Sequence, residues 1–152
     1  DRHYYVLADR SVQLGPSHWP AVVRQAVSDY DCQKVIAEGN QGGEMVRVIL
    51  RGDEKIEKDS GLDIVIVHAS RGKQARAEPI AHLYSKNLVH HCGVFYTMED
   101  QMVGWVPGSG DASPDRLDAL VWAIHYLSQY NVVGLGVGGH KQSSPSRDKY
   151  EQ

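Results

Sequence analysis

Three carboxylates occupy positions where an α/β domain could do metal chemistry. Glu38 ends the short apolar segment 34–38, directly before the glycine-rich turn 39–43. Asp115 and Asp118 lie three residues apart in a segment with helical spacing, so they share one side of a helix. Open α/β sheets bind ligands at the carboxyl ends of their strands, which is where Glu38 falls. Each position taken alone also has an ordinary explanation. Glu38 could be a solvated residue at a strand end, and Asp115 and Asp118 could be acidic residues that the helix dipole favours in a first turn.

The combination of the three carboxylates is more informative than any one of them. Mg²⁺ and Mn²⁺ prefer carboxylate oxygens. Hydrolysis of a phosphodiester by two metals needs several carboxylates around ions about 3.5–4 Å apart, one activating water and the other stabilising the leaving oxygen. The spacing therefore permits Glu38, Asp115 and Asp118 to form a catalytic site that binds two divalent cations, Mg²⁺ or Mn²⁺. Asp9, at the end of the first predicted strand, is a further candidate ligand.

A basic segment follows the third predicted strand. From Arg71 to Lys86 there are four basic residues and one acidic residue, a local charge of +3. Arg71 and Lys73 flank a glycine in a turn, where they could reach a phosphate backbone. On the residues alone, a solvated charged loop is the simpler interpretation. If the domain binds DNA, Arg71, Lys73 and Arg76 are the residues predicted to contact it, with weak sequence specificity because phosphate contacts do not read bases.

The elements that must position these residues follow from the spacing of apolar side chains. Runs of strand-forming residues predict strands over 3–8, 34–38, 62–68 and 88–91, the third buried on both faces. Helical spacing predicts a helix capped by Ser17, one over 74–86 that Pro79 interrupts, and one opened by Ser113 at the N-cap with Pro114 as its first residue. Strands alternating with helices predict an α/β domain with a largely parallel sheet.

Composition restricts the class of protein. The chain has 152 residues, of which 41% are apolar, enough for one domain with a real core. Two cysteines cannot form a disulfide framework, and no apolar stretch is long enough to predict a membrane span. A net charge of −3 argues against binding nucleic acid by overall charge, although it permits a local basic patch. Residues 131–152, rich in Gly, Ser and charge, are predicted to be a flexible tail.

Four motifs occur in order along the sequence: VIAEGNQGG (35–43), ASRGKQARAEP (69–79), MEDQM (98–102) and SPDRLDALVWA (113–123). Each motif alone is weakly specific. Together they resemble the nuclease domain of terminase large subunits from tailed phages and phage-like gene transfer elements, and the resemblance extends over about residues 4–128. The resemblance implies a single RNase H-like domain over residues 1–130, with a mixed sheet flanked by helices and an acidic cluster that binds two metals.

The resemblance also assigns roles to individual residues. Glu38 matches the family's second acidic residue, Asp115 its third, and Asp118 an additional acidic position found in many relatives, including the resolvase branch. The family's first catalytic aspartate precedes the equivalent of Tyr4, so we expect it outside residues 1–152. The implied activity is a metal-dependent endonuclease that cuts concatemeric double-stranded viral DNA during genome packaging, in the host bacterial cytoplasm at the procapsid portal.

Partners and cofactors follow from the same resemblance. It implies double-stranded DNA, the portal protein, the small terminase subunit and an ATPase domain as partners, and no membrane. No phosphate-binding loop of the Gly-x-x-x-x-Gly-Lys-Ser/Thr type is present, so we expect no ATP in this domain. We expect no zinc either, since His90 and His91 are adjacent strand residues that point to opposite faces. Two alternatives stay open: another RNase H-like nuclease of the junction-resolvase type, and a non-catalytic domain that docks on DNA or the portal.

Overall fold

The protein has a mixed α/β fold, as predicted. The computed structural model describes residues 2–39, 43–51, 62–106, 109 and 114–129. These residues form, in chain order, β1 (Tyr4–Val6), α1 (Trp19–Asp29), β2 (Lys34–Glu38), α2 (Gly43–Arg51), β3 (Asp63–Val67), α3 (Lys73–Ser85), β4 (Val89–His91), α4 (Tyr96–Gly104) and α5 (Asp115–Gln129). The predicted tail, residues 131–152, lies outside the described residues.

The described strands form two parallel pairs. β1 pairs with β4, with Tyr4 opposite Val89. β2 pairs with β3, with Glu38 opposite Val67. The parallel pairing agrees with the prediction, but the described strands make two small sheets and not one continuous sheet.

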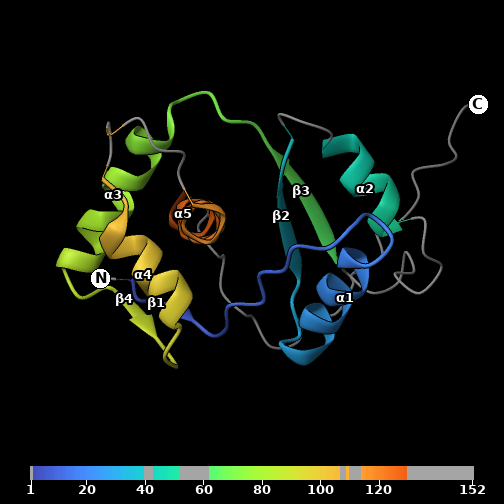
Figure 1. The fold of residues 1–152 in the computed structure, drawn as a ribbon, viewed down its shortest axis with the longest axis horizontal. Helices are drawn as coiled ribbons and strands as arrows, with labels where there is room; N and C mark the ends of the chain where they lie inside the picture. The colour runs from blue at the N-terminus through green and yellow to red at the C-terminus, as the bar shows by residue number, and fades with distance from the viewer. Residues whose placement is uncertain (1, 40–42, 52–61, 107–108, 110–113, 130–152) are drawn as a thin grey trace, which may run out of the picture.

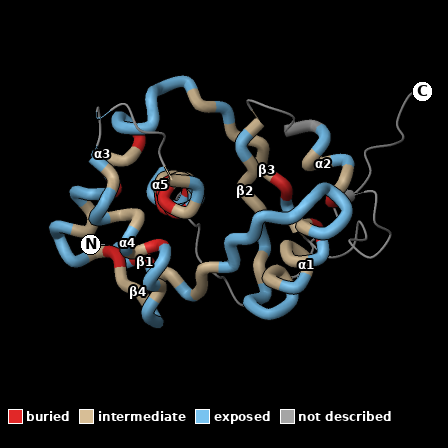
Figure 2. The backbone as a smooth tube through the Cα atoms, viewed as in Figure 1, coloured by how far each residue is buried: buried red, intermediate tan, exposed pale blue. Residues whose placement is uncertain are grey.

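Helix α5 lies at the centre of the molecule. In Figure 1 it is seen end-on, with α3, α4, β1 and β4 on one side and β2, β3, α1 and α2 on the other. The main core forms where α3, α4, β1 and β4 pack on α5, and Figure 2 shows buried positions on the α5 turns. Burying an aliphatic side chain contributes about 1.5–3 kcal/mol, so this cluster fixes α5 against α3 and α4. Its buried members are Tyr4, Ile80, Val89, Met98, Leu117, Leu120, Val121 and Ile124.

The start of α5 differs from the prediction by one residue. The helix begins at Asp115, and the carbonyl of Pro114 accepts the backbone N–H of Asp118 at 3.0 Å. Pro114 therefore occupies the N-cap and not the first helical position. Ser113, the predicted cap, lies outside the described residues.

Helix α3 continues through Pro79, contrary to the predicted interruption. Proline removes one backbone donor and crowds the preceding turn. The helix survives because its next residue, Ile80, is 2% exposed and packs in the core cluster against α5. The tertiary contact outweighs the local penalty.

The C-terminus of α3 is closed by an asparagine in the left-handed region. Asn87 has φ 55°. Its N–H donates to the carbonyl of Tyr84 at 2.9 Å, and the N–H of Leu88 donates to that of Leu83 at 3.0 Å. These two bonds are the Schellman pattern, which satisfies the last carbonyls of a helix. They direct the chain straight into β4.

Two further predictions are wrong at the level of single elements. The N-cap of α1 is His18, without a side-chain cap, and Ser17 instead hydrogen-bonds the His18 ring at 2.9 Å. In β3 only Ile64 is buried, whereas Val65 to Val67 are half-buried, and Val67 borders a cavity that also contacts α5. Among the described helices, none is long and apolar enough to cross a membrane.

Candidate functional site

Glu38 stands exposed at the carboxyl end of β2, where the chain passes very close to β3. The N–H of Gly39 donates to the carbonyl of Val67 at 2.7 Å. A Cβ on Gly39 would lie 2.5 Å from Cγ2 of Ile66 and 2.8 Å from Cε1 of His68. Any other residue at position 39 would force the Ile66 or His68 side chain to shift, so glycine permits this close approach beside the Glu38 carboxylate.

The two aspartates of α5 have different surroundings. Asp115 is exposed in the first turn, whereas the Asp118 side chain is only 15% exposed. Asp118 forms an ion pair with Lys73 at the start of α3. Its Oδ1 also lies 3.7 Å from Nη2 of Arg76, too far for a hydrogen bond but close enough for attraction between the charges. Two cations of α3 therefore neutralise Asp118.

Asp9 reaches the same first turn from the segment after β1. Its Oδ2 accepts from Nε of Arg116 at 2.9 Å, and its Oδ1 accepts from the backbone N–H of Ser11 at 3.0 Å. Burial raises the pKa of Asp9, but the hydrogen bonds from Ser11 and Arg116 outweigh it and hold that pKa below its ordinary value. Asp9 is therefore an ionised carboxylate with a cationic partner at the start of α5.

The structure thus brings Asp9 and Asp118 to the first turn of α5, each against basic partners, while Glu38 ends β2. Within the described residues, no group of three His, Cys, Asp or Glu side chains is placed to hold a metal ion. That Glu38, Asp115 and Asp118, with Asp9, bind two cations stays a prediction.

The predicted DNA-binding residues also differ in exposure. Arg71 and Lys73 are exposed, but Arg76 is only 6% exposed. Its guanidinium lies 4.7 Å from the ring centroid of Trp122, a cation–π contact. Sequence reasoning assigned only packing to Trp122. One pattern in the sequence could have indicated that Trp122 belongs to a polar surface. Positions 118, 122, 125 and 129 share one face of α5 at helical spacing and all carry polar or aromatic side chains.

Comparison with known proteins decides the family. The family model described as Terminase RNaseH-like domain matches residues 1–127. The chain belongs to this family. No curated protein and no solved structure matches the chain. The match confirms the resemblance and the RNase H-like fold, and it places the chain in a nuclease-type family of DNA packaging.

A second polar network in this terminase RNaseH-like domain connects α3, β4 and α4. The Tyr84 hydroxyl lies 2.8 Å from Nε2 of His91, and Nδ1 of His91 lies 2.8 Å from Oε1 of Glu99. Since a carboxylate only accepts, Nδ1–H of His91 donates to Glu99, and in that tautomer Nε2 can accept from the Tyr84 hydroxyl. Burial raises the pKa of Tyr84 to about 12, so its hydroxyl keeps the proton it donates.

The other end of this network explains Glu99. Its Oε1 also accepts the N–H of Phe95 at 3.3 Å. The hydrogen bond from His91, followed by that of Phe95, lowers the pKa of Glu99. His90, on the opposite face of β4, hydrogen-bonds His3 at 2.7 Å, so the two adjacent histidines have separate partners. Residue types gave no sign of the Tyr84–His91–Glu99 network, because it depends on where α3 and α4 pack.

Proposed function

We propose that the protein is a metal-dependent endonuclease that cuts concatemeric double-stranded viral DNA during genome packaging. The family match over residues 1–127 is the observation that carries the proposal, because it includes Glu38, Asp115 and Asp118. These three carboxylates are the proposed catalytic residues. They are the hard oxygen ligands that Mg²⁺ and Mn²⁺ prefer.

The arrangement of the described carboxylates does not fit a complete two-metal centre. No three of the described acidic, histidine or cysteine side chains converge on one point. Asp118 is also held by Lys73. A cation bound by Asp118 would therefore compete with Lys73 for the same carboxylate, so the ion-bound arrangement must differ from this one.

The basic residues beside Asp118 support the proposed substrate. Arg71 and Lys73 are exposed at the turn that opens α3, where they would bind the DNA backbone. A phosphate that binds Lys73 would draw it away from Asp118 and free that carboxylate for a cation. Substrate binding and metal binding would then favour one another.

The proposed setting follows from the family. We place the reaction in the host bacterial cytoplasm at the procapsid portal. The proposed partners are the portal protein, the small terminase subunit and an ATPase domain.

The test is cleavage of supercoiled plasmid with Mn²⁺ or Mg²⁺, with EDTA as the metal-free control. We expect nicked and linear products that Asp115→Asn and Glu38→Gln abolish. Asp115 is a better target than Asp118, because Asp118 has ionic partners whose loss would also affect folding. Asp100→Asn, at an exposed acidic position of α4, is the matched control and should cut normally. Intact plasmid with a folded protein and both metals would contradict the proposal.

A non-catalytic domain that docks on DNA or the portal is the second candidate. The observation in its favour is that no three of the described ligand-type side chains gather around one point. It predicts that Glu38→Gln and Asp115→Asn leave DNA packaging unchanged, whereas the endonuclease predicts uncut concatemers.

A further inference from the structure

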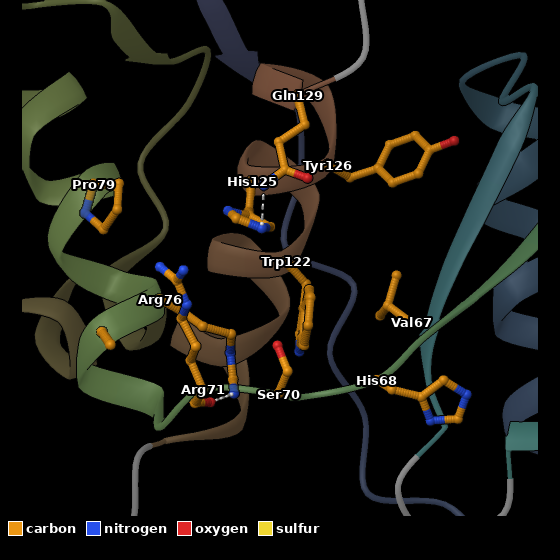
Figure 3. Close-up of a pocket in the computed structure, with 11 residues that line it drawn as sticks. Val67, His68, Ser70, Arg71, Arg76, Pro79, Trp122, His125, Tyr126 and Gln129 are labelled. Carbon is orange, nitrogen blue, oxygen red and sulfur yellow. Dashed lines mark hydrogen bonds between the residues drawn. The ribbon is translucent and has the colours of Figure 1, made fainter.

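A cavity of about 430 Å³ lies where the end of β3 and the helices α3 and α5 meet. Figure 3 shows Arg71, Arg76 and His125 between α3 and α5, with Ser70 and Trp122 nearby. The cavity is within the size range of small-molecule sites. Its polar lining is basic or neutral, with no acidic side chain among the described lining residues: His68, Ser70, Arg71, Arg76, His125 and Gln129.

Arg76 is the key residue of this cavity. One of its nitrogens, Nη1, donates to the carbonyl of Arg71 at 2.7 Å. Its Nε and Nη2 are buried, and no described atom accepts a hydrogen bond from either. A buried cationic donor without an acceptor costs about 1–3 kcal/mol or more. Asp118 attracts the Arg76 charge, but its Oδ1 lies 3.7 Å from Nη2 and accepts no hydrogen bond from it.

Trp122 adds a third unmet donor. Its indole Nε1 is buried and also has no acceptor among the described residues. Its ring packs against the Arg76 guanidinium at 4.7 Å, which holds that group in place. A basic cavity with several unsatisfied N–H groups is suited to a ligand that supplies anionic oxygens.

We propose that this cavity binds the terminal phosphate of a nucleotide, with Arg71 and Arg76 binding the phosphate oxygens. Arginine forms bidentate hydrogen bonds with phosphate. The exposed Arg71 would meet the phosphate at the entrance, and the buried Arg76 would bind it inside the cavity. The volume exceeds what a bare phosphate needs. The remaining walls are apolar or aromatic, as a sugar and base require: Val67, Pro79, Trp122 and Tyr126.

This proposal rests on the proposed nuclease function in one respect, which is that the ligand is taken to be a nucleotide. A nuclease meets phosphorylated nucleotides as the ends of its products. The same phosphate monoester could come from a free nucleotide or from a 5′-phosphorylated DNA end. Binding is measured without cleavage and without metal, so failure of this proposal and failure of the nuclease proposal are separate results.

The experiment is calorimetric titration of the protein with dTMP and with a 5′-phosphorylated oligothymidylate. Thymidine and the 5′-hydroxyl oligonucleotide serve as controls. We expect dTMP to bind and thymidine not to bind. We expect the 5′-phosphorylated oligonucleotide to bind more tightly than the 5′-hydroxyl one, whose backbone the DNA-binding residues can still contact. Binding by dTMP identifies the free nucleotide as sufficient, and binding by the phosphorylated oligonucleotide alone identifies the DNA end.

Three variants connect the binding to this cavity. Arg76→Met keeps the length of the side chain and should weaken binding at least about tenfold. Arg71→Ala, at an exposed position that cannot disturb the core, should weaken it as well. Lys86→Met removes an exposed positive charge at the other end of α3, outside the cavity, and should bind normally. Equal binding of thymidine and dTMP, no binding of either phosphorylated ligand, or normal binding by Arg71→Ala would overturn the proposal.

Discussion

Lys73 and Asp118 form an ion pair that connects the first turn of α3 to the first turn of α5. The pair lies beside Arg76, which is buried and also faces Asp118. Basic residues predicted to bind DNA and an acidic residue predicted to bind metal therefore contact one another. Mutations can therefore distinguish what the Lys73–Asp118 ion pair contributes to stability from what the two residues contribute to DNA or metal binding.

Asp118→Asn should destabilise the protein by about 3 kcal/mol, the low end for breaking a buried charge pair, because Arg76 would lose its counter-charge. Lys73→Met should cost less, within about 1 kcal/mol, since Lys73 is 44% exposed. Urea unfolding measures both. Asp63→Asn, which breaks the exposed cross-strand pair with Lys34, is the control and should also stay below about 1 kcal/mol. Equal losses for Asp63→Asn and Asp118→Asn would contradict this account.

Gly39→Ala should destabilise the protein by about 1–3 kcal/mol, because the new methyl group would overlap the Ile66 and His68 side chains at the end of the β2–β3 pair. The Glu38 backbone would shift with it, so plasmid cleavage should fall too. Gly72→Ala is the matched control, since a Cβ there meets no atom within 4 Å. Thermal unfolding compares the two. A tolerated Gly39→Ala would show that β2 and β3 do not approach this closely.

Asn87→Val should cost about 1–2 kcal/mol, because a β-branched residue is strained at φ 55°. Asn87→Gly should be neutral or slightly stabilising, since glycine adopts this conformation readily. The difference in melting temperature between these two variants is the readout. If both variants melt together, the C-terminus of α3 does not have the Schellman geometry.

Glu99 should make stability depend on pH. Its folded-state pKa is below the ordinary value of 4.5, mainly through the hydrogen bond from His91. Such a group stabilises fully above its unfolded pKa, and the contribution disappears as pH falls through the lower folded pKa. The stability difference between wild type and Glu99→Gln should therefore shrink as the pH is lowered from neutral to about 3. Urea unfolding across that range checks this. A Glu99→Gln difference that stays constant over this pH range would mean that the His91 hydrogen bond does not form in solution.

Local features of the fold could be predicted from the sequence. Pro114 and the apolar stripe of α5 located the helix start to within one residue. The apolar segment before Gly39 located Glu38 at a strand end. These two predictions succeed because capping, periodicity and turn formation depend on residues that are near neighbours in the chain.

Features that depend on distant contacts could not be predicted. The burial of Arg76 requires α5 to pack across α3, and nothing in segment 71–86 distinguishes Arg76 from its exposed neighbours. The helix persists through Pro79 because Ile80 packs in the core, which overrides a local rule. The division of the described strands into two pairs likewise depends on which strands meet in the fold, which local patterns do not specify.

Anomalous diffraction from crystals soaked in Mn²⁺ tests the central claim most directly. The claim is that Glu38 and Asp115 bind catalytic divalent cations. It predicts one or two anomalous peaks within coordination distance of both carboxylates, about 2–2.3 Å from their oxygens, with loss of the peaks in Asp115→Asn. No peak there, with the two carboxylates apart and DNA still bound, would contradict the nuclease site and favour a docking domain.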